Sequence, residues 1–548
     1  MLGCYGNTLV KTPNIDRLAE SGTIFKNSYC KFPVCGPSRA SIMTSLRPET
    51  VGVMDLGTDF RLKDPDVLSL PEHFKNNGYR TAGTGKIYDV RNVDNSAECD
   101  KPSWSIKFDT YGATAKRHAS KHARDVIREE IARQGNVYNY KHYDVNASLV
   151  LAPVCADEEL PDGAIAQVAM ALMNHLVDGH DSHGQPLPPG EEASPFFLAV
   201  GFNKPHLPFW APKRYWDLYN PDTLPDLATA DRILHDTGYA MHDSFEFRDY
   251  YPVPRVGPIS KELRRQALHG YLACISYVDA LVGRVLQTVD DLGLRERMAI
   301  VLWGDHGFHL GDHGMYGKHS ILESGANMPL IIIPPGGSAV RTVSSPVELI
   351  DVFPTLCDLA KLPIPPQLQG RSLVPLLTGA QKSVREGAIT LNDAWWDHPG
   401  YGWSRARVGT SALGYSYRTN RYRFTQWVGY TDQKPADAIR PTSSEQLAHW
   451  TPTGESAGIE LYDYQVDPGE TRNLAYEPSH KELLRGLAMK LRTQCDGCER
   501  LIFGKGGNCF GRCNVCPDWC ATWTCTAQWC EGDVNAKPAA CSNGCIHV

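Results

Sequence analysis

The amino-acid sequence predicts an α/β protein whose strands form a sheet covered by helices. Two continuous apolar runs, at residues 196–202 and 298–303, are typical of buried strands. Residues 262–288 place apolar side chains along one side of a helix, as expected of a helix that packs on a sheet. Residues 67–86 indicate a helix that is ended by Gly78 and followed by a short strand. Helices that alternate with buried strands in this way are typical of the α/β class.

Length and composition fit a globular enzyme of two or three domains. The chain has 548 residues, of which 42% are hydrophobic and 21% charged. Its net charge of −7 is mild and no basic stripe is present, which argues against nucleic acid as a partner. No run approaches the roughly 20 consecutive apolar residues that span a bilayer, so we expect no transmembrane segment. The residues after Met1 show neither the basic start nor the apolar stretch of a signal peptide.

The cysteines are concentrated at the C-terminal end of the chain. Ten of the 17 lie between Cys495 and Cys545, and the other seven are scattered through the preceding residues. So dense and even-numbered a cluster favours a disulfide-bonded module made in an oxidising compartment. The Cys495-x-x-Cys498 spacing would also suit zinc, but His547 is the only histidine in this tail, which favours disulfides.

Two features nearer the middle of the chain bear on the same question. Asn146 begins an Asn-Ala-Ser triplet, which is an acceptor pattern for N-glycosylation. Cys99 and Cys155 flank an irregular polar segment and could form a disulfide, although their spacing does not determine the connectivity. Both features agree with an oxidising compartment without establishing it.

One short stretch, residues 33–45, carries a cysteine in an activating environment. Cys35 is followed by Gly-Pro-Ser-Arg, and Ser38 is predicted to cap a helix that begins at Arg39. A cysteine just before a helix N-terminus and near a guanidinium is expected to favour its thiolate. The alternative is a buried structural cysteine beside a turn, because most cysteines belong to protein cores.

Polar side chains follow the predicted strands, at the ends where α/β proteins bind their ligands. Lys86 ends one strand, Lys204 and His206 follow a second, and Asp305 and His306 follow a third. Each has a plain alternative: a solvated loop lysine, a structural histidine, or an incidental Asp-His pair. A carboxylate next to an imidazole at the end of a strand nevertheless suits a divalent cation.

Taken together, these stretches resemble the signature sequences of the type I sulfatases. The matching stretches, in the family's order, are Cys35-x-Pro-Ser-Arg39, Gly85-Lys86, Lys204-Pro-His206-x-Pro, Asp305-His306-Gly and Gly311-x-His313-Gly followed by Lys318. The resemblance extends over about residues 2–492, with gaps near 90–160 and 380–405, and is greatest to the iduronate-2-sulfatase branch of that family.

The resemblance implies an alkaline-phosphatase-like fold. In such a fold a large mixed sheet is sandwiched by helices and followed by a smaller C-terminal α+β subdomain, to which this chain adds a Cys-rich tail. On that basis we expect the catalytic domain at residues 1–350, the subdomain at 351–492 and the tail at 493–548. Within the subdomain, residues 412–428 alternate as in a hairpin that turns at Thr419 and Asn420.

The resemblance also implies a role for each candidate side chain. A formylglycine-generating enzyme would convert Cys35 into formylglycine, whose hydrated aldehyde attacks sulfur, and one calcium ion would be bound beside it. Arg39 and Lys86 would hold the aldehyde hydrate, and His313 would shape its loop. The implied residues are, for catalysis, Cys35, Arg39, Lys86, His206 and Lys318; for substrate binding, Lys204, His206 and Lys318; and for the metal, Cys35, Asp305 and His306.

The implied function is a sulfuric ester hydrolase that removes sulfate from a sulfated uronic acid or another sugar of a polysaccharide, such as a glycosaminoglycan. We expect it in the secretory pathway, lysosomal or extracellular. Two alternatives stay open. One is a phosphodiesterase or phosphonate hydrolase of the same superfamily, and the other is a catalytically inactive, sulfatase-like protein that binds partners through its Cys-rich tail.

The sequence departs from the family pattern at three places. In the family, a buried strand that ends in two metal-binding aspartates precedes the stretch matching Leu2–Gly6. The given sequence begins just after the position of that strand, which we interpret as truncation. We expect the chain as given to be inactive and to fold poorly, because anionic ligands and a central strand are missing. Asp89 stands where relatives have a histidine and is assigned no role, and Ser45 stands where they have glycine.

Overall fold

The structure is a computed structural model that describes most of the chain. The described residues are 1–93, 99–108, 121–133, 147–178, 195–227, 233–393, 397–398, 403–404, 412–431 and 451–494. Asn146 and the ten cysteines of the tail lie outside these residues, so the predictions made for them stay predictions.

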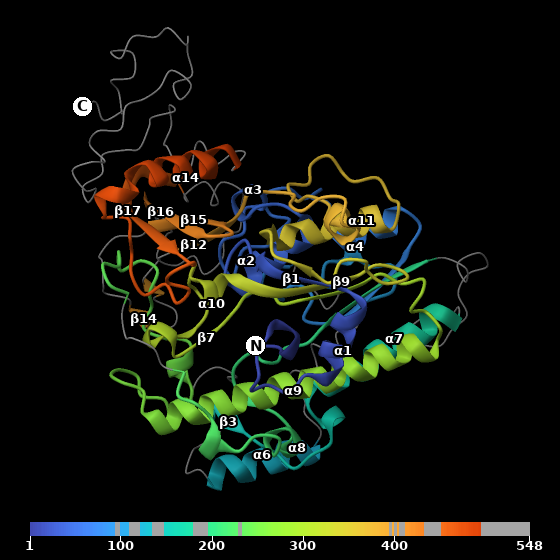
Figure 1. Cartoon of the computed structure of the whole chain (residues 1–548). Helices are drawn as coiled ribbons and strands as arrows, with labels where there is room; N and C mark the ends of the chain where they lie inside the picture. Colours follow the sequence, from blue (N-terminus) through green and yellow to red (C-terminus); the bar gives the residue numbers. More distant parts are fainter. Residues whose placement is uncertain are drawn as a thin grey trace.

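A mixed sheet forms the centre of the molecule (Figure 1). Its strands, in spatial order, are β10 (Thr342–Val343), β1 (Thr23–Tyr29), β9 (Asn327–Ile333) and β6 (Ile300–Trp303), and β11 (Val347–Glu348) also pairs with β1. Strand β9 runs antiparallel to both β1 and β6, whereas β10 and β11 run parallel to β1. The sheet is therefore mixed, as the resemblance implies, and β6 confirms the strand predicted at 298–303.

Two further strands form a separate parallel pair. Strands β2 (Arg80–Gly85) and β4 (Phe196–Gly201) are paired from end to end. Helix α4 (Leu70–Asn76) precedes β2, and the Ser69 hydroxyl caps it by accepting a hydrogen bond from the Glu72 amide at 3.3 Å. The chain leaves this helix through Gly78, whose φ of +84° is a conformation that glycine adopts without strain. The helix, its end and both strands confirm the sequence predictions.

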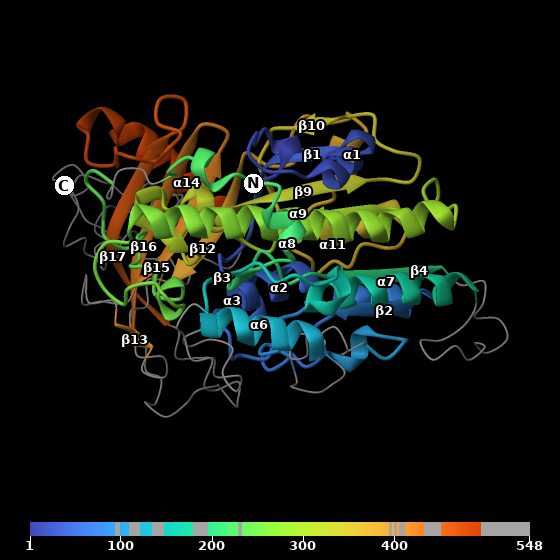
Figure 2. The same ribbon diagram turned by 90° about the horizontal axis from the view of Figure 1, so that it is seen from below.

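Helices cover both faces of these strands (Figures 1 and 2). Helices α9 (Lys261–Asp291) and α7 (Pro161–Asp178) lie on one side, and α2 (Cys35–Thr44), α4 and α11 (Val352–Leu359) lie on the other. Ile331 of β9 shares a hydrophobic cluster with Leu272 of α9, whereas Met328 of the same strand shares one with Phe353 of α11. The sheet is thus the middle of three layers.

Helix α9 is the longest helix among the described residues. By length and composition alone it would suffice to cross a membrane, but most of its apolar stretch is buried within the protein. The Ser260 hydroxyl caps its N-terminus by accepting a hydrogen bond from the Leu263 amide at 3.2 Å. Its burial agrees with the packing role predicted for residues 262–288.

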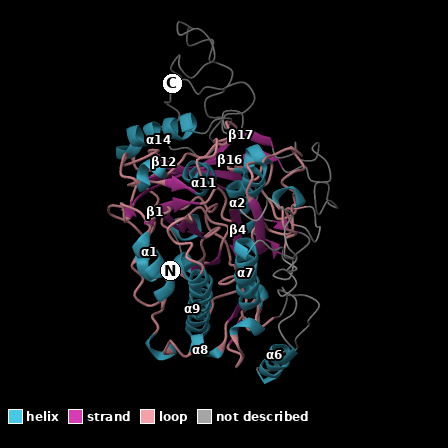
Figure 3. Ribbon diagram, turned by 90° about the vertical axis from the view of Figure 1, so that its right-hand side faces the viewer, coloured by secondary structure: helices cyan, strands magenta, loops and turns pink. Residues whose placement is uncertain are grey.

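A second, antiparallel sheet follows later in the chain. It consists of β12 (Gly387–Asp393), β15 (Ala412–Thr419), β16 (Tyr422–Thr431) and β17 (Thr451–Asp463), in this order. Strands β15 and β16 form the hairpin predicted at 412–428, with Gly414 opposite Trp427. Helix α14 (Lys481–Gln494) lies over this sheet, at the end of the molecule where Figure 3 shows β12, β16 and β17.

Buried ion pairs join the two sheets. Lys31, just after β1, donates to Glu348 at 2.8 Å, and Arg385, just before β12, pairs with both Glu348 and Asp351. The amide of Ile389 in β12 also donates to Glu348, at 2.6 Å. All four charged side chains are buried, so each depends on the others to offset the loss of its hydration.

The described residues form further helices and strands outside these layers. The remaining helices are α1 (Pro13–Ser21), α3 (Pro48–Val51), α6 (Lys121–Arg133), α8 (Lys213–Trp216), α10 (Glu323–Ala326) and α12 (Val374–Leu377). The remaining strands are β3 (Val150–Leu151), β5 (Phe209–Trp210), β7 (His309–Leu310), β8 (Tyr316–Gly317), β13 (Asp397–His398) and β14 (Trp403–Ser404). Cys155 is a free cysteine in the structure, so the disulfide between Cys99 and Cys155 that the sequence left open is not formed.

Candidate active site

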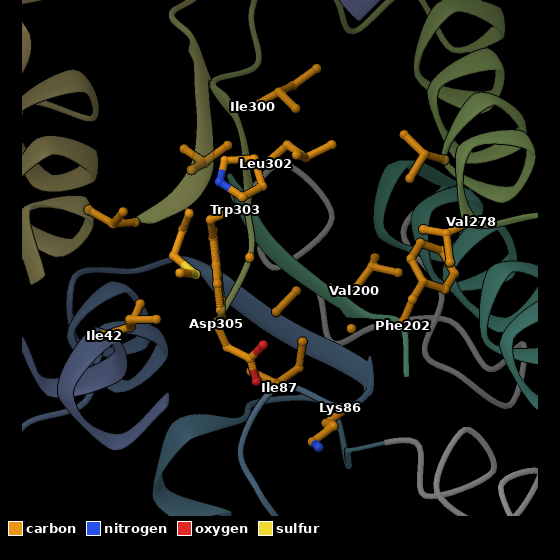
Figure 4. A pocket seen from close by; sticks show the side chains of 18 of the residues that line it. Ile42, Lys86, Ile87, Val200, Phe202, Val278, Ile300, Leu302, Trp303 and Asp305 are labelled. Atoms are coloured by element: carbon orange, nitrogen blue, oxygen red, sulfur yellow. The ribbon is translucent and has the colours of Figure 1, made fainter. Parts of the chain in front are cut away.

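The candidate site lies where the carboxyl ends of three strands meet the N-terminus of α2. Figure 4 shows Lys86 and Asp305 at this end of the strands. The side chains that line one cavity here are Lys86 after β2, His206 after β4, Asp305 and His306 after β6, Lys318 after β8, and Cys35 and Arg39 of α2. Residues far apart in the sequence are therefore brought together at one edge of the sheet, as the α/β class predicts.

Helix α2 begins earlier than the sequence predicts. Its first residue is Cys35, its N-cap is Val34, and Ser38 lies inside the helix instead of capping it. The hydroxyl of Ser38 donates to the Asp305 carbonyl oxygen at 2.5 Å. Pro37 explains the error, because proline is tolerated in the first turn of a helix, where its missing N–H costs no hydrogen bond. Cys35 is therefore part of the first turn, at the positive end of the helix dipole.

The Cys35 thiol is buried and surrounded by cations. Its sulfur lies 3.1 Å from Nε2 of His306, and only 1% of the residue is exposed. Burial raises the pKa of the thiol, but the positive charges of Lys86, Lys318 and His306 outweigh it. The pKa is therefore well below its ordinary value, and the site favours a negative charge at this position.

Asp305 is held as a carboxylate by its neighbours. Nε of Arg39 donates to Oδ2 of Asp305 at 2.8 Å, and the same guanidinium donates to the backbone carbonyls of Lys86 and, at 3.0 Å, Ile87. Burial raises the pKa of Asp305, but Arg39 and His306 bring it below its ordinary value. Arg39 therefore ties the loop after β6 to the end of β2.

Asp89 is neutralised by a second arginine. Its carboxylate accepts two hydrogen bonds from Arg91, at 2.8 and 2.9 Å, and lies 3.7 Å from Nζ of Lys86. Burial raises the pKa of Asp89, but Arg91 and Lys86 outweigh it and bring the pKa well below its ordinary value. The Asp89–Arg91 pair explains how an acidic side chain is tolerated here. The sequence did not predict a role for Arg91, because no spacing pattern marks it.

Lys318, His206 and Glu246 form a second polar group near Cys35. Nζ of Lys318 lies 3.3 Å from Nε2 of His206 and 2.7 Å from a carboxylate oxygen of Glu246. Burial raises the pKa of Glu246, but Lys318 and His206 lower it to about 2. Burial and Lys318 lower the pKa of His206, so its imidazole is neutral near pH 7. Sequence reasoning missed Glu246, which lies in a stretch without helical or strand periodicity.

Two other candidates lie in the loops that frame the site. The ammonium nitrogen of Lys204 donates to the carbonyls of His206, at 3.0 Å, and Pro208, at 2.6 Å, so this lysine stabilises its own loop. Its role as a sulfate contact stays a prediction. His313 has a φ of +54° in the loop before β8, in keeping with a part in the shape of that loop.

Three side chains could contribute to a metal site. The donor atoms of Cys35, Asp305 and His306 lie within 4.8 Å of one another, and this is the one such group of His, Cys, Asp and Glu found in the described part of the chain. Calcium takes six to eight oxygen ligands, whereas this group offers a single carboxylate that already accepts a hydrogen bond from Arg39. These three side chains by themselves do not make a calcium site.

The fold and the site together define a class of protein. It is a hydrolase of the alkaline-phosphatase-like fold in which a buried cysteine lies among positively charged side chains. Residues 1–362 match the sulfatase family, and residues 311–434 match the C-terminal domain of N-sulphoglucosamine sulphohydrolase. Iduronate 2-sulfatase of Mus musculus is 30% identical over 545 aligned residues, which cover 89% of this chain and 90% of the relative. The chain belongs to the sulfatase family, the hydrolases of sulfate esters.

Solved structures of similar proteins agree on the fold. The phosphonate monoester hydrolase of Agrobacterium radiobacter superposes with a TM-score of 0.63 at 21% identity, covering 90% of this chain and 92% of that one. A protein solved in complex with its substrate, D-glucosamine-2-N,6-O-disulfate, gives 0.62 at 21% identity, covering 90% and 94%. At this identity the likeness establishes the fold and not the substrate.

Proposed function

We propose that this protein is a formylglycine-dependent sulfatase that acts on a sulfated uronic acid, or another sulfated sugar, of a polysaccharide. The observation that carries the proposal is Cys35 in the first turn of α2, buried among Lys86, Lys318 and His306. The 30% identity to iduronate 2-sulfatase supports the substrate class. A lysosomal or extracellular location belongs to the same proposal.

Different side chains of the site would bind the sulfate ester and activate it for hydrolysis. As a hydrate, the formylglycine made from Cys35 supplies the oxygen nucleophile for sulfur. Lys86 and Lys318 would offset the negative charge that accumulates on the sulfate oxygens in the transition state. Glu246 keeps Lys318 charged, because its carboxylate raises the pKa of that lysine above the ordinary value despite burial.

His206 and Arg39 have different parts in this proposal. The neutral imidazole of His206 donates through Nδ1 to the Leu207 carbonyl at 2.7 Å, so its Nε2, 3.3 Å from Nζ of Lys318, accepts from that ammonium and would help to position it for the sulfate. Arg39 acts on the loop after β6 by fixing the Asp305 carboxylate. Calcium would need oxygen ligands beyond the carboxylate of Asp305, and the roles given above are those of the side chains themselves.

The test combines the chemical identity of residue 35 with a panel of substrates. The full chain is produced together with a formylglycine-generating enzyme, and mass spectrometry of the Cys35 peptide shows whether the aldehyde has formed. The panel contains 4-methylumbelliferyl sulfate, a 2-sulfated iduronide, a phosphate diester and a phosphonate monoester. We expect the aldehyde and a preference for sulfate esters, and Cys35→Ala should abolish both. Faster turnover of the phosphate diester would overturn the proposal and favour the phosphodiesterase alternative.

An inactive, sulfatase-like binding protein is the second candidate. The observation in its favour is that Asp305 is the one carboxylate in the group of possible metal ligands. Titration calorimetry with calcium distinguishes the active sulfatase from the inactive binding protein. A functional sulfatase site would bind the ion, and Asp305→Asn would weaken that binding. Formylglycine at residue 35 without calcium binding and without turnover of any ester would establish the second candidate.

A further inference from the structure

Arg91 adds a cation at the edge of the candidate active site. Its guanidinium holds the Asp89 carboxylate through Nε, at 2.8 Å, and through Nη2, at 2.9 Å. The carboxylate oxygen that accepts from Nη2 also lies 3.7 Å from Nζ of Lys86, which Figure 4 shows at the end of β2. Because both nitrogens lie close to one oxygen atom, Arg91 and Lys86 form a pair of neighbouring cations.

One edge of the Arg91 guanidinium is open to a ligand. An arginine carries five N–H donors, which form two forks of parallel N–H groups. Asp89 occupies the fork of Nε and Nη2, and no group in the described part of the chain accepts a hydrogen bond from Nη1. The Arg91 side chain is 39% exposed and that of Asp89 only 3%. The pair is therefore buried at its carboxylate and accessible at the fork of Nη1 and Nη2.

The loop that carries Arg91 is fixed at both ends. At its start, the guanidinium of Arg39 donates to the Ile87 carbonyl at 3.0 Å. At its end, the side-chain amide of the buried Asn92 donates to the Thr58 carbonyl at 2.7 Å. A cation held on such a loop binds an anion at a lower cost in conformational entropy than one on a free loop.

The charge of Arg91 acts on the groups around Cys35. Burial lowers the pKa of Arg91, but Asp89, Cys35 and Glu246 outweigh it and raise that pKa above its ordinary value. Burial and Arg91 lower the pKa of Lys318, although Glu246 and Cys35 raise it by more. Because such interactions weaken with distance and are screened by salt, Arg91 lies within reach of a ligand bound at Cys35.

We propose that the open fork of Arg91 is a subsite for a second anionic group of the substrate, a carboxylate on the saccharide that carries the sulfate. This inference rests on the proposed function, because it requires a sulfate ester bound at Cys35. A planar carboxylate matches the two parallel N–H groups of the fork and binds them bidentately. A uronic acid carries such a carboxylate on the same ring as its sulfate. Asp89 then holds Arg91 in the orientation that presents this fork.

The test is equilibrium binding of two ligands that differ only in the carboxylate. One is the methyl glycoside of 2-sulfated iduronic acid, and the other is the matching 2-sulfated idoside, in which a hydroxymethyl group replaces the carboxylate. Titration calorimetry uses the full chain made without formylglycine, so that neither ligand is hydrolysed. We expect tighter binding of the iduronide, and Arg91→Met should weaken it by about tenfold and that of the idoside much less. Arg91→Lys keeps the charge but not the fork and should give an intermediate loss.

Two control variants separate this role from the neutralisation of Asp89. Arg91→Met leaves the Asp89 carboxylate without its partner, so it would repel any sulfate. The double variant with Asp89→Asn removes that charge and should recover binding of the idoside without recovering the preference for the iduronide. Arg421 is the matched control, since it holds Asp463 through Nε and Nη2 at 2.9 and 2.7 Å in the turn between β15 and β16. Arg421→Met should change neither affinity.

The outcomes also distinguish this inference from the proposed function. If the unmodified chain binds the idoside and the iduronide equally well, the sulfate site stands and the carboxylate subsite is wrong. Equal losses for both ligands in Arg91→Met would likewise overturn the subsite, because Arg91 would then only neutralise Asp89. If neither ligand binds, the sulfate site of the proposed function fails and the subsite fails with it. A third ligand, the idoside with a second sulfate on its hydroxymethyl group, would overturn the carboxylate assignment if its binding alone depended on Arg91.

Discussion

The Cys35 thiol lies in an electrostatic field set by Lys86, Lys318 and His306. Burial alone would keep it protonated, so these positive charges decide its state. Glu246 opposes them, but it is paired with Lys318 at 2.7 Å. The balance at this one sulfur atom is therefore sensitive to the loss of a single lysine.

We expect Lys318→Met to raise the pKa of the Cys35 thiol. The midpoint of the pH–rate profile for alkylation of Cys35 by iodoacetamide would then move to higher pH, because a larger share of the thiol stays protonated at a given pH. Mass spectrometry of the Cys35 peptide at a series of pH values measures this profile in protein made without formylglycine. Lys318→Arg keeps the charge, and an equal shift of the midpoint in that variant would contradict the electrostatic explanation.

The place of most candidate residues could be predicted from the sequence because they stand next to strand ends, whereas their roles rest on the resemblance to the sulfatases. Lys86, His206 and Asp305 each follow a strand that apolar runs or turn signals mark clearly. Glu246 and Arg91 could not be predicted, because they enter the site through irregular loops whose path depends on tertiary packing. Their charges change the chemistry nonetheless, since they pair with Lys318 and Asp89.

Helix α2 shows how a local pattern can place a helix end wrongly. The sequence places the helix start at Arg39 because Ser38 is a good cap, but Pro37 and the apolar surroundings favour a start at Cys35. At its other end, Ser45 follows the helix with a φ of +54°, the left-handed conformation that favours glycine, which is the residue that relatives have here.

Ser45 offsets this strain with two hydrogen bonds. Its hydroxyl donates to the Ile350 carbonyl at 2.7 Å and accepts from the Gly370 amide at 3.1 Å. We expect Ser45→Ala to destabilise the protein by about 2 kcal/mol, because it loses both bonds and keeps the strain. Ser45→Gly loses the same bonds but relieves the strain, so it should be about 1 kcal/mol less destabilising. Urea denaturation measures the free energy of unfolding of both variants. Equal losses would contradict the explanation that the positive φ of residue 45 strains a non-glycine residue.

Strand β17 carries a carboxyl group, that of Glu460, whose pKa is raised in the folded protein. Glu460 is buried and accepts a hydrogen bond from Thr237, and burial raises its pKa from 4.5 to about 7. Between these two values the folded state holds a proton that the unfolded chain has released. Stability must therefore fall as pH rises from about 4.5 to 7.

Glu460→Gln should remove this dependence. The variant keeps an acceptor for Thr237 but carries no charge, so above pH 7 it should be more stable than the unmodified chain by roughly 3 kcal/mol. The difference should vanish near pH 4. Thermal denaturation at several pH values measures it, with Glu482→Gln, an exposed carboxylate of α14, as the control. A difference that does not vary with pH would rule out Glu460 as the cause.

On the scale of the whole molecule, the sequence predicted the layers better than the connections between them. Periodicity and apolar runs identify α9, β4, β6 and the β15–β16 hairpin, because each depends on local residue spacing. The buried network of Lys31, Glu348, Asp351 and Arg385 could not be predicted, because its members come from three separate segments.

The ion network between the sheets has a consequence for heat denaturation. Separating the two sheets would expose the buried charges or leave them buried without a partner. Thermal unfolding should therefore be cooperative across the described fold. Differential scanning calorimetry should record one heat-absorption peak. Arg385→Met, which leaves Glu348 and Asp351 without their shared partner, should cost about 3–5 kcal/mol and resolve two peaks. If the unmodified protein already shows two peaks, the two sheets melt as independent units and the network does not couple them.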